Sequence, residues 1–207
     1  LEERLPARGF EVSALPFSSV RHLHKALRHA AYFFKCWALA RHADAVFAQD
    51  TVSVGFPAAL AAMLARKPFI IRVPGDYAWE QGRQRFGVDD ELDAFQTKKY
   101  GWRVALLRSI QQFVVRRAKL VIVPSKYMLG IVSGWGVKAM LVYNGIGLPV
   151  PAIPQRREPG FLVVTIARRV PWKGIEALER VVARKKGWKL VVAEDLPRAE
   201  ALGWAAA

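Results

Sequence analysis

The stretch Phe161–Gly174, FLVVTIARRVPWKG, decides the fold class of this chain. Its first six residues are small or β-favouring and apolar, which predicts a buried strand over Phe161–Ile166. Apolar side chains recur at helical spacing over Ile175–Arg184, so a helix is expected there. A buried strand that leads through a short loop into a helix is typical of parallel α/β folds.

The loop between this strand and helix is basic, because it contains Arg168, Arg169 and Lys173. Gly174 follows them, directly before the N-terminus of the helix. Unpaired backbone N–H groups and the positive end of a helix dipole meet at such a point. With a lysine and an arginine added, the loop suits a phosphate group. A solvated basic turn is the alternative, since short motifs recur by chance.

Composition and net charge limit the classes of protein to which this chain can belong. The chain has 207 residues, 53% of them hydrophobic, which is enough for a sizeable core and excludes a disordered protein. A formal net charge of +15 points to phosphate-rich partners, namely nucleic acid, anionic lipid or phosphorylated small molecules. The single cysteine, Cys36, excludes an internal disulfide framework and fits a reducing compartment.

Polar residues follow two predicted strands in the first half of the chain. Asp50 comes after the strand expected over Ala45–Gln49, and Gly75 and Asp76 come after the strand expected over Phe69–Val73. In parallel α/β sheets, ligands gather at the carboxyl ends of the strands, so these residues are expected to face one crevice. Loop capping by short acidic side chains is the alternative for both aspartates.

Further elements follow from periodicity and turn residues. They are a strand over Phe10–Leu15, a helix over Trp102–Arg117, a strand over Leu120–Pro124, a helix over Lys126–Ser133 that Ser125 caps, and a strand over Ala139–Tyr143. The polar segment Gly82–Tyr100 interrupts this alternation of strands and helices, and it is expected to be a mobile loop on the substrate side.

An amphipathic helix is predicted within Val20–His42. One stripe carries Leu23, Leu27, Ala30, Phe34 and Trp37, and basic residues lie largely outside it. The stripe is expected to pack in the core, and binding to an anionic membrane surface is the alternative. The four histidines of the chain all lie in this segment, and their spacing predicts no metal site.

Two long runs carry a resemblance to a known family. They are AKLVIVPSKYMLGIVSGWGVKAMLVYNGI at 118–146 and, after a Pro-rich link, FLVVTIARRVPWKGIEALERVV at 161–182. Their order and spacing resemble a family 4 glycosyltransferase of the GT-B fold. The resemblance implies an α/β protein with two Rossmann-like, doubly wound parallel-sheet domains. The first domain, at 1–149, would lack its first strand, 150–159 would be a linker, and the second domain, at 160–207, would be incomplete.

The resemblance also implies a set of site residues. Arg168 and Lys173, with Gly174, match the family's binding site for the diphosphate of the donor. Gly75 and Asp76 match the segment of the first domain that faces the acceptor, and Asp50, because it follows a predicted strand, is expected in the same acceptor-side cleft. No metal or other cofactor is expected, and no catalytic residue is assigned.

The implied activity is transfer of a hexose from a nucleoside diphosphate sugar to a hydroxyl acceptor, with retention of configuration. The acceptor would be a cell-envelope glycan or a lipid-linked glycan. The protein would be cytoplasmic, with peripheral contact to an anionic membrane at its inner face. Family members also carry a Gly-rich loop near the start and two glutamates eight positions apart in the second domain. This chain shows neither, so the chain alone is expected to be inactive.

Two other classes stay open. A non-catalytic basic module could bind a membrane surface or nucleic acid. Nucleic acid is not the expected partner, because the arginines are scattered over several helices without an aromatic-basic stacking platform. A nicotinamide-dependent dehydrogenase would need a G-x-G-x-x-G motif after a strand, and no predicted strand is followed by one.

Overall fold

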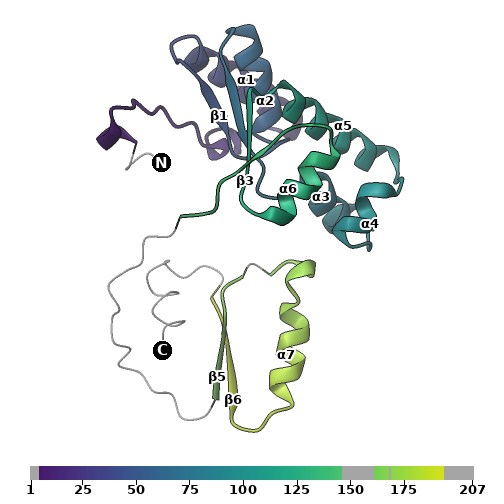
Figure 1. The fold of residues 1–207 in the computed structure, drawn as a ribbon. Coiled ribbons are helices and arrows are strands. Elements are labelled where there is room, and N and C mark those ends of the chain that lie inside the picture. Colours follow the sequence, from purple (N-terminus) through teal and green to yellow (C-terminus); the bar gives the residue numbers. More distant parts are fainter. Residues whose placement is uncertain (1–4, 146–160, 168, 194–207) are drawn as a thin grey trace. The chain divides into compact units, whose positions relative to one another are not determined.

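The computed structural model describes residues 5–145, 161–167 and 169–193. The chain forms two compact units, which we call unit 1 (Leu1–Asn144) and unit 2 (Gly145–Ala207) (Figure 1). The predicted linker at 150–159 and the tail from residue 194 onward lie outside the described residues.

Unit 1 is built on a parallel sheet of four strands, in the order β1-β2-β3-β4. The strands are β1 (Val46–Ala48), β2 (Phe69–Arg72), β3 (Leu120–Val123) and β4 (Met140–Leu141). In the central pair, Ile71 lies opposite Val121. The sequences of β2 and β3 are almost entirely apolar, as expected for parallel strands whose two faces are both covered.

Helices flank this sheet (Figure 1). They are α1 (Lys25–Ala40), α2 (Gly55–Leu64), α3 (Tyr77–Arg85), α4 (Leu92–Thr97), α5 (Trp102–Arg117) and α6 (Lys126–Gly134), with short 3₁₀ turns at Pro6–Arg8 and Phe17–Val20. Helix α2 packs against both α1 and α5, and α3 packs against α5. The core between helices and sheet includes Tyr32, Ala59, Ile71, Val114 and Val132.

The described residues of unit 2 form a strand-helix-strand motif. Strands β5 (Phe161–Thr165) and β6 (Trp188–Val192) are parallel and pair from Phe161 opposite Trp188 to Thr165 opposite Val192. Helix α7 (Ile175–Ala183), preceded by a 3₁₀ turn at Pro171–Lys173, connects the two strands and packs against β6. The parallel α/β fold predicted from the sequence is therefore confirmed in both units.

The strand predicted over Phe10–Leu15 is wrong. These residues are described, and they form no strand and pair with none. Phe10 is exposed, so the segment lacks the covered face that makes a β-favouring sequence form a strand. Propensity alone does not form a strand when no sheet edge accepts its hydrogen bonds.

The mobile loop predicted over Gly82–Tyr100 is also wrong. The end of α3 and all of α4 occupy much of this segment, and Val88 and Phe95 are buried. A Cβ added to Gly82 would lie 2.9 Å from Val88 Cγ2, so the chain after α3 folds closely back onto that helix. The apolar residues of this segment are interspersed with charged and polar ones and showed no clear periodicity from which to predict this packing.

The apolar stripe predicted for the first long helix matches the inner face only in part. Leu23 and Trp37 of the stripe pack against the core, whereas Leu27 and Phe34 are exposed. Tyr32, Cys36 and Ala40 of α1, which were not in the predicted stripe, are buried. The helix has alanine or aromatic residues on nearly every side, so its periodicity did not single out the inner face. In the described ranges, no helix combines the length and the hydropathy needed to cross a bilayer.

Candidate functional site at the carboxyl ends of two strands

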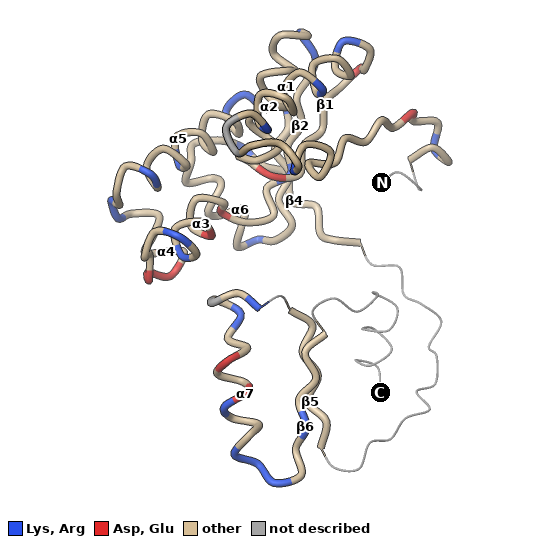
Figure 2. Tube along the Cα trace, turned by 180° about the vertical axis from the view of Figure 1, so that it is seen from behind, with Lys and Arg blue, Asp and Glu red and all other residues tan. Residues whose placement is uncertain are grey.

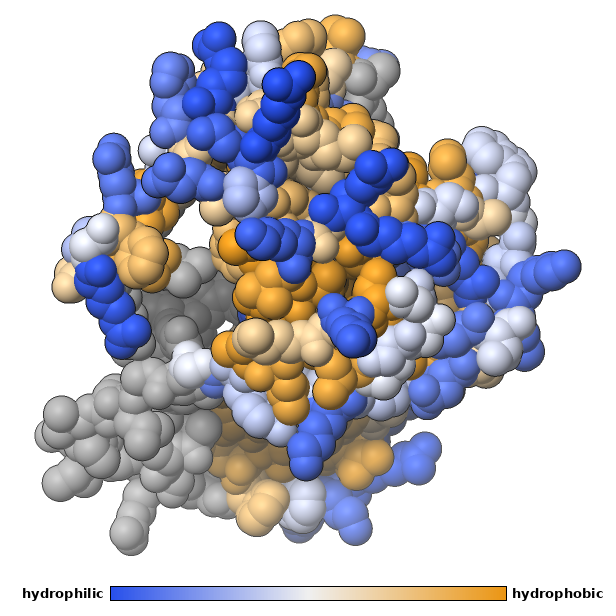
Figure 3. Space-filling view, turned by 45° about the horizontal axis from the view of Figure 1, so that its top comes forward, coloured by the Kyte–Doolittle hydropathy of each residue, from blue (hydrophilic) through white to orange (hydrophobic). Residues whose placement is uncertain are grey.

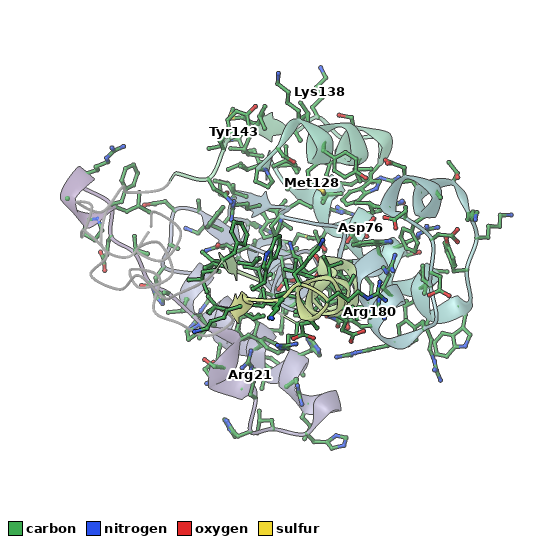
Figure 4. The ribbon with its side chains drawn as sticks, turned by 90° about the horizontal axis from the view of Figure 1, so that it is seen from below. Arg21, Asp76, Met128, Lys138, Tyr143 and Arg180 are labelled. Atoms are coloured by element: carbon green, nitrogen blue, oxygen red, sulfur yellow. The ribbon has the colours of Figure 1, made fainter. Side chains whose placement is uncertain are left out.

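Asp76 lies at the centre of the polar groups that follow β2. Its side chain is only 2% exposed and caps α3, because Oδ1 accepts a hydrogen bond from the Trp79 backbone N–H at 3.0 Å. Gln111 Nε2 donates to the same oxygen at 3.1 Å, and Gln96 Nε2 donates to Oδ2 at 2.9 Å. Figure 4 labels Asp76 within the helices of unit 1. Asp76 therefore joins α3, α4 and α5 through one carboxylate.

Gln111 connects the ends of two strands. Its Oε1 accepts hydrogen bonds from the Tyr77 backbone N–H at 2.9 Å, after β2, and from Thr51 Oγ1 at 3.0 Å, after β1. Both Thr51 and Gln111 are 1% exposed. Polar residues after β1 and β2 thus meet at a glutamine that sequence analysis did not select. In the sequence, the only indication of its role is that this polar residue stands at a position of α5 that faces the core.

Asp50 has a local role. Its Oδ1 accepts hydrogen bonds from the backbone N–H groups of Val52 at 2.8 Å and Val54 at 3.0 Å, which closes the loop before α2. A Cβ added to Gly55 would lie 2.1 Å from the Asp50 carbonyl oxygen, so only glycine fits there. These hydrogen bonds match the loop-capping alternative for Asp50.

Gly75 adjoins the first turn of α3. A Cβ added there would lie 2.8 Å from Glu80 Oε1, the end of a flexible side chain that can move aside. The close approach is therefore tolerable, unlike that at Gly55. Of the three residues expected on the acceptor side, the structure brings Gly75 and Asp76 together, and Asp50 closes a separate turn.

A pocket of about 280 Å³ opens beside Asp76, between α4, α5 and α6. Its lining includes Asp76, Gln96, Arg108, Gln111, Gly130 and Trp135. A Cβ added to Gly130 would meet nothing within 4 Å, so this part of the lining borders open space. Carboxylate, amide and guanidinium groups around a small cavity suit a hydroxylated ligand.

The polar groups of the pocket are held in fixed orientations. Trp135 Nε1 donates to Gln96 Oε1 at 2.9 Å. Arg108 donates to the carbonyl oxygens of Phe95 and Lys98, and its guanidinium lies 3.8 Å from the centre of the Phe95 ring. Burial lowers the pKa of Arg108 from its ordinary value, while the charge of Asp76 favours the cation. Several acidic residues of this basic chain lie around α3 and α4 (Figure 2).

The second candidate site is the loop before α7 in unit 2. Lys173 is exposed and Gly174 occupies the N-cap position of α7, with φ +67° and no side-chain cap. The first backbone N–H groups of a nine-residue helix are thus left for another acceptor. Arg168, the other residue expected here, lies outside the described residues. Arg169 Nη1 lies 2.8 Å from Glu179 Oε1, so this arginine pairs with α7.

Metal-ligating side chains do not cluster in the part of the chain that the structure describes. Within it, histidine, cysteine, aspartate and glutamate form no group of three or more that could hold a metal ion. Asp76 and Arg108 at the first site are instead engaged in hydrogen bonds within the protein, and Arg169 at the second site forms an ion pair.

Comparison with known proteins identifies the family. Residues 2–145 match the family described as the glycosyl transferase 4-like domain. A solved structure of a UDP-N-acetylglucosamine 2-epimerase from Listeria monocytogenes is similar at 15% identity and a TM-score of 0.49, over 89% of this chain and 49% of that one. This chain thus spans about half the length of that structure. No curated protein sequence matches the chain. Because the family match covers well over half of its residues, the protein belongs to the glycosyl transferase 4-like family.

Proposed function

We propose that the protein contributes to the transfer of a hexose from a nucleoside diphosphate sugar to a hydroxyl group of a cell-envelope or lipid-linked glycan. The observation that carries this proposal is the family match over residues 2–145. The basic loop of unit 2 supports it from an independent part of the chain. The bond between the anomeric carbon and the diphosphate breaks, a bond from that carbon to the acceptor oxygen forms, and the proton of the acceptor hydroxyl passes to the leaving diphosphate. In this proposal, the transfer retains the configuration of the anomeric carbon and requires no metal or other cofactor.

The donor diphosphate binds at Arg168, Lys173 and Gly174. The uncapped first turn of α7 offers backbone N–H groups and the positive end of the helix dipole to an anion. Lys173, directly before Gly174, adds a mobile cation. During transfer, negative charge develops on the leaving diphosphate, and positive groups fixed in place stabilise it.

The acceptor binds in the pocket beside Asp76, with Asp50 and Gly75 on the same side of unit 1. Oδ1 of Asp76 accepts two hydrogen bonds from the chain, from Trp79 and Gln111. Oδ2 accepts one, from Gln96, so it is the oxygen with capacity for a hydroxyl of the acceptor. The amide of Gln96 then orients both the carboxylate and the ligand.

The protein works in the cytoplasm, in peripheral contact with the inner face of the cell membrane. Its net charge of +15 supports contact with a surface of anionic lipids. A lipid-linked acceptor would be presented at that surface.

Binding of inorganic pyrophosphate to the purified chain tests the donor site, because pyrophosphate carries the charge shared by all nucleoside diphosphate donors. By titration calorimetry, K173A is expected to weaken binding about tenfold, since one charge-assisted contact is lost. R169A is the matched control, because Arg169 pairs with Glu179. It should change the affinity less than twofold.

Equal loss in both variants, or no binding by the wild-type chain, would contradict the donor site. The non-catalytic alternative, a basic module that binds a membrane surface, would then be favoured.

A further inference from the structure

The turn after α7 in unit 2 carries a run of cations. Residues 184–189 read RKKGWK, and all of them are exposed. Figure 2 shows the basic part of this turn in blue at the end of α7. Cations near the carboxyl end of a helix balance the helix dipole, and Arg180 in the last turn of α7 already meets that need. The cations that follow Arg180 are therefore in excess of what the helix end requires.

The stability of the fold does not account for these cations. Arg184 lies four residues after Arg180, and like charges at this spacing destabilise a helix. Within the described ranges, Arg184, Lys185 and Lys186 form no ion pair. On the face of the protein shown in Figure 3, strongly hydrophilic side chains (blue) are interspersed with apolar ones (orange), whereas these three cations are consecutive. Their charge is available to a ligand.

Two aromatic rings lie beside this turn. Phe161 and Trp188 stand opposite each other in β5 and β6, with 4.4 Å between the ring centroids and 35° between the ring planes. Phe161 is 57% exposed and Trp188 is 39% exposed. The Trp188 backbone N–H donates to the Lys185 carbonyl oxygen at 3.2 Å, which ties the tryptophan backbone to the basic turn. Rings and cations thus form one surface, the basic-aromatic patch, defined by Phe161, Arg184, Lys185, Lys186 and Trp188.

The rings lie on the side of the two-stranded sheet that faces α7. Side chains alternate along a strand, so Trp188 shares a face of β6 with Leu190 and Val192. Those two residues line a cavity together with Val182 of α7. Helix α7 ends at Ala183, and the exposure of both rings means that it does not cover them. Sequence spacing does not reveal this patch, because its two rings meet only when β5 pairs with β6.

Charge and exposure decide among possible ligands. A second copy of the patch would bring cations against cations, which is unfavourable. An anionic lipid surface requires apolar side chains that insert below the cations, but Trp188 is more than half covered and packs on Phe161 instead. Single-stranded nucleic acid matches both parts of the patch, because its phosphates suit the cations and the flat faces of its bases stack on exposed rings.

We propose that the basic-aromatic patch binds single-stranded nucleic acid. A base stacks on the exposed surface of the Phe161–Trp188 pair, and neighbouring phosphates contact the cations of the turn. Stacking tolerates any base, so the binding is not specific for sequence. It is also separate from the proposed sugar transfer, because the patch lies at the carboxyl end of α7 and the proposed donor site lies at its N-terminus.

Fluorescence anisotropy of a labelled oligo-dT strand of about 12 nucleotides tests the stacking, with the purified full chain as the partner. The wild type is expected to bind this strand about tenfold more tightly than an abasic strand with the same phosphates. W188L keeps an apolar side chain on the sheet and should lose about tenfold in affinity for oligo-dT, with the affinity for the abasic strand nearly unchanged. W102L is the matched control, because Trp102 is 72% exposed and lies on α5, and it should bind as the wild type does.

Charge variants test the basic turn. The triple variant R184Q/K185Q/K186Q should make the plot of log K against log salt concentration shallower by about 2, since each phosphate contact on a single strand contributes about 0.7. K99Q/K126Q/K138Q removes the same charge from exposed positions of unit 1 and should leave the slope nearly unchanged. Circular dichroism of each variant checks folding. The charge variants leave the sheet intact, so they test the patch even if W188L does not fold.

Four outcomes would overturn the inference. The first is absence of strand binding by the wild type, and the second is equal affinity for the oligo-dT and abasic strands. The third is an equal change of slope in the two triple variants, which would place the binding outside the patch. The fourth is binding to vesicles of phosphatidylcholine and phosphatidylglycerol that R184Q/K185Q/K186Q abolishes, without any strand binding, since the ligand would then be a lipid surface. Strand binding should be unchanged in K173A, which separates the patch from the donor site.

Discussion

Gln111 and Asp76 face each other in the interior of unit 1, with 3.1 Å between Nε2 and Oδ1. Both side chains are almost completely buried, and 35 residues of chain separate them. A neutral amide can donate to the carboxylate with one end and accept from Thr51 and Tyr77 with the other. The pair therefore gives the buried carboxylate group a neutral hydrogen-bond partner.

Replacing Gln111 by leucine should destabilise the protein by about 3 kcal/mol, because several buried partners lose a hydrogen bond at once. The midpoint and slope of urea unfolding measure this change. Q112L is the matched control one residue further along α5, where the glutamine is only half-buried, and it should cost about 0.5 kcal/mol or less. Equal costs for the two variants would mean that the network contributes no specific stability.

Alanine at Gly55 and alanine at Gly130 should have opposite effects. At Gly55 the new Cβ would lie 2.1 Å from the Asp50 backbone oxygen, so G55A should destabilise unit 1 by about 3 kcal/mol. At Gly130, inside α6, the new Cβ would meet nothing within 4 Å, so G130A should stabilise by about 0.5–1 kcal/mol. Thermal unfolding of the two variants checks the signs. Stabilisation by G55A would show that the loop before α2 is not held as described.

Stability should fall in alkaline solution. Burial raises the pKa of the Cys36 thiol to about 11, above its ordinary value, and burial also raises the pKa of Tyr32. Because the folded state holds these protons more tightly than the unfolded state, their contribution is complete below the ordinary pKa of the thiol. The contribution of Cys36 is lost as the pH rises through about 11.

Urea unfolding at a series of pH values between about 8 and 11 measures this loss. C36A removes one of the two groups, so its stability should decline less steeply than that of the wild type. Native Cys36 should also react slowly with thiol reagents at neutral pH, since little thiolate is present. Rapid labelling of the native chain would contradict the burial of Cys36.

Elements with a local signal could be predicted from the sequence. The helix Trp102–Arg117 was predicted with both of its observed ends. The cap of α6 was also predicted, and Ser125 Oγ accepts a hydrogen bond from the Met128 backbone N–H at 3.1 Å. Spacing and capping residues act within a few positions, so a reader of the sequence sees them directly. The inner face of α1 could not be predicted, because apolar residues surround that helix.

Some residues of the candidate site could likewise be predicted from the sequence, and others could not. Asp50 and Asp76 were found because each follows a strand, but the sequence could not say which one caps a loop and which one lines a pocket. Gln96, Gln111 and Trp135 were missed, because their hydrogen bonds join residues 20 to 60 positions apart. Pairings of this kind arise from the packing of α4, α5 and α6, which no local pattern encodes.

The strands of unit 1 lie side by side in the order in which the ribosome makes them. Each new strand therefore meets an edge that is already formed, and none has to enter between two existing neighbours. A chain emerging from the ribosome can extend this sheet one strand at a time, with α2 in place before β2 appears. Synthesis and folding of unit 1 can thus advance together, with little unpaired strand waiting for a partner that has yet to be translated.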